Sequence, residues 1–186
     1  GGQDSMALLG LLLGLQHLHD WHFQLWHGDH GWHDQSATIA SELNAWCQGQ
    51  ELDLQISRST RENKGTEASA RSWRYQELAA LSQQLCCRTV LTAHTASDRA
   101  EGLLLRLARG TDLAVVGSLR PIRPLQNNDP SGPRLVRPLL SFSRDDTAQI
   151  CQDLKLPIWL DPSNTNPAFS RNRIRNEVLP VLEELH

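Results

Sequence analysis

The apolar residues of this chain alternate between helix-like and strand-like spacing over its first 110 positions. Helical spacing predicts helices over residues 5–18, 34–47, 67–85 and 97–109, the last closed by Gly110. Between them, residues 23–28, 52–56 and 88–93 have the short apolar or period-two pattern of strands. Strands that alternate with helices favour a parallel sheet covered on both faces. We therefore predict an α/β fold with three layers and a Rossmann-like parallel sheet.

The pattern changes after Gly110, where prolines punctuate residues 111–140. Arg134–Leu140 is predicted to be an edge strand, 145–154 a helix, and 126–132 an exposed insertion. A final helix is expected to begin near Arg173. We divide the chain into a main domain, 1–140, and a C-terminal part, 141–186, that leads into a short helical extension. Because an α/β domain of this kind begins with a strand, one is expected before Gly1.

Charge is distributed unevenly along the chain. Residues 1–57 contain seven acids and no Lys or Arg, so all 18 basic residues lie in the remainder, and all but Lys64 and Lys155 are arginine. The planar donor fork of arginine matches phosphate oxygens, which favours a nucleotide or nucleic-acid surface. A solvated face with helical ion pairs is the alternative.

The sequence lacks two kinds of feature, a membrane-spanning segment and paired cysteines, and each absence argues against a class of protein. The longest apolar run, Met6–Leu15, contains two glycines and is too short to cross a bilayer, so we expect no membrane partner. The four cysteines lack C-x-x-C spacing, which argues against zinc or an iron–sulfur cluster. We expect reduced thiols in a cytoplasmic protein.

A glycine-rich turn, Gly1-Gly2-Gln3-Asp4-Ser5, runs into the first predicted helix. Glycines let a backbone approach phosphate oxygens, and the N–H groups of a helix start bind anions. Asp4 and Ser5 lie at or beside the N-cap, where they could also hold magnesium. A merely capped helix start is the alternative. The segment is not a G-x-x-x-x-G-K-[ST] loop of the Walker type.

Two polar clusters follow predicted strands, at the edge where ligands bind in such folds. His27-Gly-Asp-His-Gly31 ends the first strand; with His33 its spacing suggests a metal site, but three rings on an extended segment would not converge. Thr92–Glu101 follows the third strand and contains His94, Asp98 and Glu101, which could bind magnesium and accept a proton. Asp98 has the alternative role of an N-terminal helix residue.

Two further segments carry arginines. One predicted helix face carries Glu67, Arg71, Arg74 and Tyr75. Glu67 and Arg71 could form an ion pair on this face. Alternatively, its two arginines could be directed at phosphates or RNA. Asp161–Asn164 precedes Phe169–Arg175, whose three arginines at alternate positions predict phosphate contacts at the entry to the final helix.

Together these segments resemble the tRNA(Ile)-lysidine synthetase family, within the N-type ATP pyrophosphatase (PP-loop) superfamily and its adenine nucleotide alpha hydrolase-like fold. Gly1–Ser5 resembles the S-G-G-x-D-S loop, which identifies only the superfamily. Glu67–Tyr75 resembles the more specific helix E-x-x-A-R-x-x-R-Y. The other matching segments are His27–Gly31, Thr92–Thr111, Arg137–Leu140, Asp161–Asn164 and Arg171–Arg175. The resemblance makes 1–140 a PP-loop ATP-pyrophosphatase domain.

The resemblance implies a reaction on cytidine 34 of a tRNA(Ile) with a CAU anticodon. The C2 carbonyl oxygen of the base attacks the α-phosphate of ATP, with Mg²⁺ present, and pyrophosphate leaves. The free amine of L-lysine then displaces AMP and gives lysidine. Such an enzyme is a carbon–nitrogen ligase of tRNA modification.

The resemblance also implies residue roles. ATP is bound by Gly1, Gly2, Gln3, Asp4, Ser5 and His27. Asp4 and Asp98 hold magnesium and are catalytic together with Arg74 and His94, and Glu101 contacts lysine. The expected tRNA contacts are Arg71, Arg106, Arg109, Arg171, Arg173 and Arg175. Thr95, Arg99 and Gly102 replace the His, Gln and Thr common in the family, and none of them has an assigned role.

Other readings remain open. A tRNA thiolase shares the adenylation step but generally uses paired cysteines. Amidotransferase-coupled relatives, such as GMP or asparagine synthetases, do not explain the arginines of 171–175. A non-catalytic RNA-binding module does not explain Asp4, His94 and Asp98. A monomer and a homodimer both fit the sequence.

Overall fold

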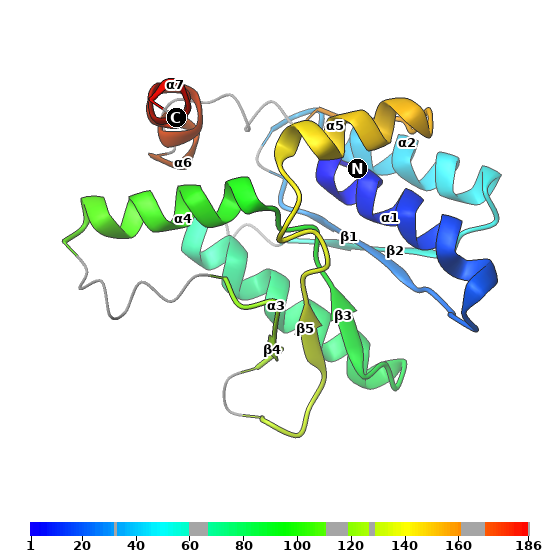
Figure 1. Cartoon of the computed structure of the whole chain (residues 1–186). Coiled ribbons are helices and arrows are strands. Elements are labelled where there is room, and N and C mark those ends of the chain that lie inside the picture. Colours follow the sequence, from blue (N-terminus) through cyan, green and yellow to red (C-terminus); the bar gives the residue numbers. More distant parts are fainter. Residues whose placement is uncertain (32, 60–66, 111–118, 127–128, 161–169, 186) are drawn as a thin grey trace.

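The computed structural model describes residues 1–31, 33–59, 67–110, 119–126, 129–160 and 170–185 (Figure 1). Its helices are α1 (Gln3–Leu15), the 3-10 turn η1 (Gln16–Leu18), α2 (Ser36–Gly49), α3 (Glu67–Gln84), α4 (Ala96–Ala108), α5 (Arg144–Asp153), α6 (Ser170–Arg173), the π-helical η5 (Ile174–Val178) and α7 (Leu179–Glu184). Its strands are β1 (Leu25–Asp29), β2 (Leu54–Arg58), β3 (Thr89–Leu91), β4 (Ile122–Pro124) and β5 (Arg134–Val136).

The described strands form two sheets. β1 pairs in parallel with β2, with Leu25 opposite Leu54, and β3 pairs in parallel with β5, with Thr89 opposite Arg134. β4 lies antiparallel on the other side of β5. No described strand pairs with the free edge of β1 or of β3. The strand expected before Gly1 stays a prediction.

A hydrophobic core on one side of β1 and β2 joins α1, α2 and α5. Its buried members are Met6, Ala7, Leu9, Leu43, Cys47 and Cys151, with Leu25 and Leu54 of the strands packed against them. The fit between α1 and the segment that follows α5 is close: a Cβ at Gly10 would lie 2.6 Å from Leu156 and 2.9 Å from Leu154. A side chain at position 10 would therefore force these two leucine side chains to move.

The opposite face is covered by α3. Leu78 and Ala79 of this helix pack on Leu125 and Leu135, and Trp26 of β1 reaches the same core. Side chains alternate across a strand, so Leu25 faces α1 and α2 whereas Trp26 faces α3. This arrangement confirms the predicted α/β fold with helices on both faces of parallel strands.

The prediction of an edge strand was wrong. The segment 134–140 was expected at an edge, but β5 is central in the order β3-β5-β4 and ends at Val136. Pro133 and Pro138 flank β5 and so remove no donor from it. Beside it β4 lies at an edge of the described strands, where Pro124 needs no strand partner for its nitrogen.

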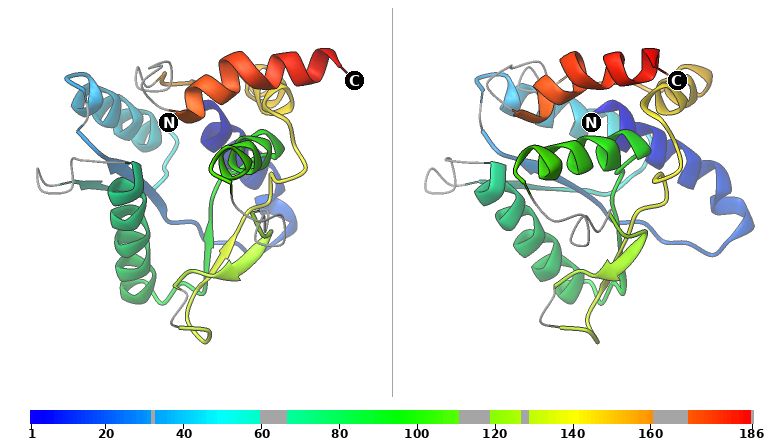
Figure 2. Two further views of the ribbon diagram at one scale, coloured as in Figure 1. Left: turned by 90° about the vertical axis from the view of Figure 1, so that its left-hand side faces the viewer. Right: turned by 60° about the vertical axis from the view of Figure 1, so that its left-hand side comes forward.

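The C-terminal segment forms a helical extension, as predicted, that begins at Ser170 and lies beside α4 (Figure 2). It is interrupted by a π turn, η5, which ends two residues before Pro180. A proline inside an α-helix clashes with the carbonyl four residues earlier, and a wider turn relieves this contact.

Some expectations lie outside the described residues: most of the loop 57–66, part of the insertion 126–132, and Asp161–Asn164. Of the helices that the structure describes, none is both long and apolar enough to cross a membrane.

We predict that Leu135→Ala destabilises the protein by about 2–5 kcal/mol. The side chain of Leu135, on β5, is fully buried against α3, so its removal leaves a cavity. Leu160→Ala is the control, since Leu160 is 79% exposed, and is expected to change stability by less than about 0.5 kcal/mol. Urea unfolding measures both; equal midpoints would refute the assigned core.

Candidate active site

The glycine turn is the start of α1, and it is fixed by α5. Gly2 is the N-cap residue, with extended backbone. The Gln3 side-chain amide donates to the Arg144 carbonyl at 2.7 Å and to Thr147 Oγ1 at 2.9 Å. The Thr147 hydroxyl, fully buried, donates to Asp4 Oδ1 at 2.6 Å. Gln3 therefore positions the turn through its side chain, and α5 orients the Asp4 carboxylate.

The junction of β3 and α4 holds His94 and Asp98. Thr95 caps α4: its hydroxyl accepts from the Asp98 N–H, while Asp98 Oδ2 accepts from the Thr95 N–H at 2.8 Å. Asp98 is therefore a capping-box residue, which is the alternative role that its sequence position allowed. Among the described residues its Oδ1 makes no hydrogen bond, so this oxygen can still face a ligand.

His94 is a neutral imidazole at neutral pH. Burial lowers its pKa to about 4; Asp98 opposes this shift, and Arg137, Arg71 and Arg74 add to it. His94 Nδ1 lies 3.0 Å from Thr92 Oγ1. The electrostatic partners of His94 show that α3, the start of α4 and the residue after β5 meet around this ring.

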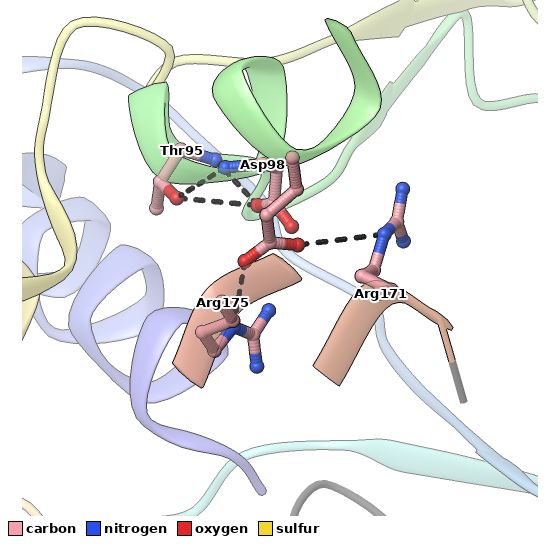
Figure 3. A network of polar contacts seen from close by, with 5 residues as sticks. Thr95, Asp98, Arg171 and Arg175 are labelled. Atoms are coloured by element: carbon pink, nitrogen blue, oxygen red, sulfur yellow. Dashed lines mark hydrogen bonds and ion pairs between the residues drawn. The ribbon is translucent and has the colours of Figure 1, made fainter. Parts of the chain in front are cut away.

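Glu101 is the most deeply buried acid of the described residues, with no exposed area. Its Oε1 accepts from Arg175 Nε at 2.6 Å, and its Oε2 lies 3.4 Å from Arg171 Nε (Figure 3). The two arginine side chains are 22% and 28% exposed, respectively. Glu101, expected to contact lysine, is thus enclosed by two arginines expected to contact tRNA.

Arg175 also connects the two magnesium candidates. Burial alone would lower the pKa of its guanidinium, but Glu101, Asp98 and Asp4 raise it. Asp4 and Asp98 both act on this one guanidinium, so the starts of α1 and α4 are directed toward a common region. Carboxylate oxygens are preferred magnesium ligands, and a site with two of them would be completed by phosphates and water. Among the described residues no group of three or more His, Cys, Asp or Glu could hold a metal.

Several expected residues lie elsewhere. His27 is inside β1, and its neighbour His30 meets α3 instead, with Nε2 at 3.2 Å from Arg74 Nη2. Arg109 is the C-cap of α4, about 16 Å along the helix from Asp98. Arg106 lines a cavity of about 380 Å³ with Arg99, Leu103 and Leu119, on a different face of α4 from Glu101. Arg173 is exposed and pairs with Glu177.

Three residues near this region carried no role in the sequence analysis. Thr147 orients Asp4, while Arg137 and Arg123 surround Tyr75. Arg137 did belong to the segment Arg137–Leu140, so that motif match was a signal for it. Thr147 and Arg123 had no such signal.

Comparison with known proteins gives consistent matches. The family model described as a PP-loop domain matches residues 1–182. A tRNA(Ile)-lysidine synthase of Parasynechococcus marenigrum is 61% identical over 186 residues, which are 100% of this chain and 55% of the relative. One of Prochlorococcus marinus (strain SARG) is 50% identical over 193 residues, 100% of this chain and 56% of the relative. The chain spans about half the length of these relatives.

A solved structure shares the fold. The U34-tRNA thiolase NcsA from Methanococcus maripaludis, with its [4Fe-4S] cluster, superposes with a TM-score of 0.76 at 16% identity, covering 100% of this chain and 65% of the thiolase. Identity this low carries the fold and no activity. The resemblance to lysidine synthetases is confirmed by the relatives that bear this name. Through residues 1–182, the chain belongs to the PP-loop domain family.

Proposed function

We propose that the protein adenylates cytidine 34 of a tRNA(Ile) with a CAU anticodon and joins it to L-lysine. The base carbonyl oxygen attacks the α-phosphate of ATP, the P–O bond to pyrophosphate breaks, and lysine then displaces AMP. The observation that carries the proposal is that Asp4 and Asp98, at the starts of two helices, both raise the pKa of the Arg175 guanidinium, which is held by Glu101 at 2.6 Å. Identity of 61% to a lysidine synthase over the whole chain supports it.

In this proposal each group of site residues has its own role. The N–H groups at the start of α1 bind phosphate oxygens, because a helix start attracts anions. Asp4 and Asp98 would hold magnesium, which when bound neutralises phosphate charge. Arg74 stabilises the negative charge that develops as pyrophosphate leaves. The tRNA backbone meets the half-buried Arg106 and the exposed Arg109 and Arg173.

The cysteines distinguish this proposal from the thiolase alternative. Cys47 and Cys151 lie in the core between α1, α2 and α5, whereas Cys86 is exposed after α3 and Cys87 half-buried. Iron–sulfur clusters are commonly held by four cysteine thiolates gathered in one place. We propose reduced thiols and a cytoplasmic enzyme; the oligomeric state is open to either a monomer or a homodimer.

Lysine binding requires a rearrangement at Glu101. Both of its oxygens face arginines and the residue has no exposed area, so a lysine ammonium can reach the carboxylate only if one of the arginines moves aside. We propose that Arg171 moves, since its contact of 3.4 Å is longer than the 2.6 Å contact of Arg175. Arg175 then keeps Glu101 charged and oriented.

The proposal is tested by incubating the purified full-length protein with tRNA transcript, ATP and labelled lysine, followed by mass analysis of nucleoside 34. We expect labelled lysidine, and Asp4→Asn is expected to lower the rate by about 100-fold. Asp20→Asn, at an exposed turn, serves as the control. A sulfur-bearing nucleoside would favour the thiolase, and absence of pyrophosphate release would favour the RNA-binding module.

Glu101→Gln is predicted to destabilise the protein by about 3 kcal/mol, because two partly buried guanidiniums lose their counter-charge. It should also raise the KM for lysine by at least about tenfold. Glu177→Gln, which breaks the exposed Arg173 pair, should change stability by less than about 0.5 kcal/mol and leave KM unaltered. Urea unfolding and steady-state kinetics measure both; an unchanged KM in a folded Glu101→Gln protein would remove Glu101 from lysine binding.

The neutral His94 contributes hydrogen bonding rather than charge to this site, and its burial predicts a pH dependence. Its pKa is about 4 in the folded protein and 6.5 ordinarily, so between these values the unfolded chain binds a proton that the native protein does not. Stability should therefore fall as pH decreases from 6.5 to 4, by up to about 3 kcal/mol. His94→Asn should flatten this part of the profile, whereas His22→Asn, at an exposed position, should not. Parallel profiles for all three proteins would contradict the buried neutral imidazole.

A further inference from the structure

Tyr75 of α3 is surrounded by three arginines, and we call these four residues the Tyr75 cluster. The guanidinium carbons of Arg71 and Arg123 lie 5.4 and 5.0 Å from the centre of the Tyr75 ring. Arg137 is the third arginine whose charge acts on the Tyr75 phenol. Burial alone would raise the pKa of the phenol, but the arginines lower it. The ring therefore holds three cations together that would otherwise repel one another.

Arg137 is the buried member of this cluster. Only 2% of its surface is exposed, and its Nη1 donates to the Arg120 carbonyl at 2.6 Å. Its Nε is buried and has no hydrogen-bond partner in the part of the chain that the structure describes. In the same part, no carboxylate forms an ion pair with Arg71, Arg123 or Arg137. A buried guanidinium with an unused donor and no acid is costly unless an anion completes it.

The cluster adjoins the candidate active site. Arg137 follows β5 and His94 follows β3, and because these strands are parallel their carboxyl ends meet at one edge. Arg71 and Arg137 both lower the pKa of His94, which Asp98 raises. The Tyr75 cluster thus lies at the same sheet edge as His94 and within electrostatic reach of it, as Asp98 does.

We propose that Arg71, Arg123 and Arg137 form a binding site for the pyrophosphate group, in ATP and after its release, with Tyr75 as the residue that positions them. This inference rests on the proposed function. Phosphate oxygens suit the planar donor forks of arginine, and three of them match the charge of a pyrophosphate. An RNA backbone phosphate has the same chemistry, but the burial of Arg137 favours a small anion over a phosphate on a polymer.

The probe is inorganic pyrophosphate, titrated calorimetrically into the full-length protein. Arg71→Gln and Arg123→Gln are each expected to raise its Kd by about tenfold, since each removes a charge-assisted contact. Arg137→Gln should have the largest effect. Arg134→Gln is the matched control, because Arg134 lies on β5, the strand that precedes Arg137, but is exposed. Circular dichroism measures whether each variant is folded. If Arg137→Gln does not fold, the test uses the Arg71→Gln and Arg123→Gln variants.

A Kd for pyrophosphate within twofold of wild type in folded Arg71→Gln and Arg123→Gln overturns the proposal. So does a loss confined to tRNA affinity, measured by filter binding, since this result would assign the cluster to the RNA backbone. The measurement needs no tRNA modification. Failure to form lysidine with pyrophosphate binding intact would therefore refute the proposed function alone, and lysidine formation with unchanged pyrophosphate binding in the variants would refute this site alone.

Discussion

The candidate active site depends on one buried carboxylate, that of Glu101. It ties α4 to the C-terminal helical extension through Arg171 and Arg175, and no solvent screens these contacts from the Glu101 side. Burying a carboxylate is unfavourable by several kcal/mol unless cations neutralise it, so the pairing also fixes where α6 and η5 lie. Arg175 is thereby directed toward Asp4 and Asp98. An interaction near the end of the chain thus organises residues near its beginning.

Local patterns in the sequence were sufficient for most of the elements, because helices and strands follow the spacing of apolar side chains. The bounds of α3 and α4 differ by one residue from those expected, for example Ala96–Ala108 against 97–109. Strand order was not accessible in this way. The segment 134–140 was expected at an edge, whereas pairing with β3 and β4 makes β5 central. Pairing between distant segments leaves no local pattern in either one.

The chemistry of the site could be predicted by residue type but not by partner. Asp98 was expected to face magnesium, yet one of its oxygens caps α4, a choice that depends on the neighbouring Thr95. Glu101 was expected to be open to a ligand, and its enclosure follows from contacts across some seventy residues of sequence. Arg123 and Arg137 meet only because β4 and β5 bring them to one tyrosine. Such contacts between distant residues depend on the tertiary structure.

The placement of the cysteines has a practical consequence. Cys47 and Cys151 are buried between three helices, and burial raises the pKa of both thiols, whereas Cys86 is exposed after α3. Alkylating reagents react with the thiolate, so they would modify Cys86 directly but reach the core thiols only when α1, α2 and α5 separate. The natural sequence thus contains its own reporters: the rate at which Cys47 and Cys151 become labelled would time the opening of this half of the molecule without any introduced probe.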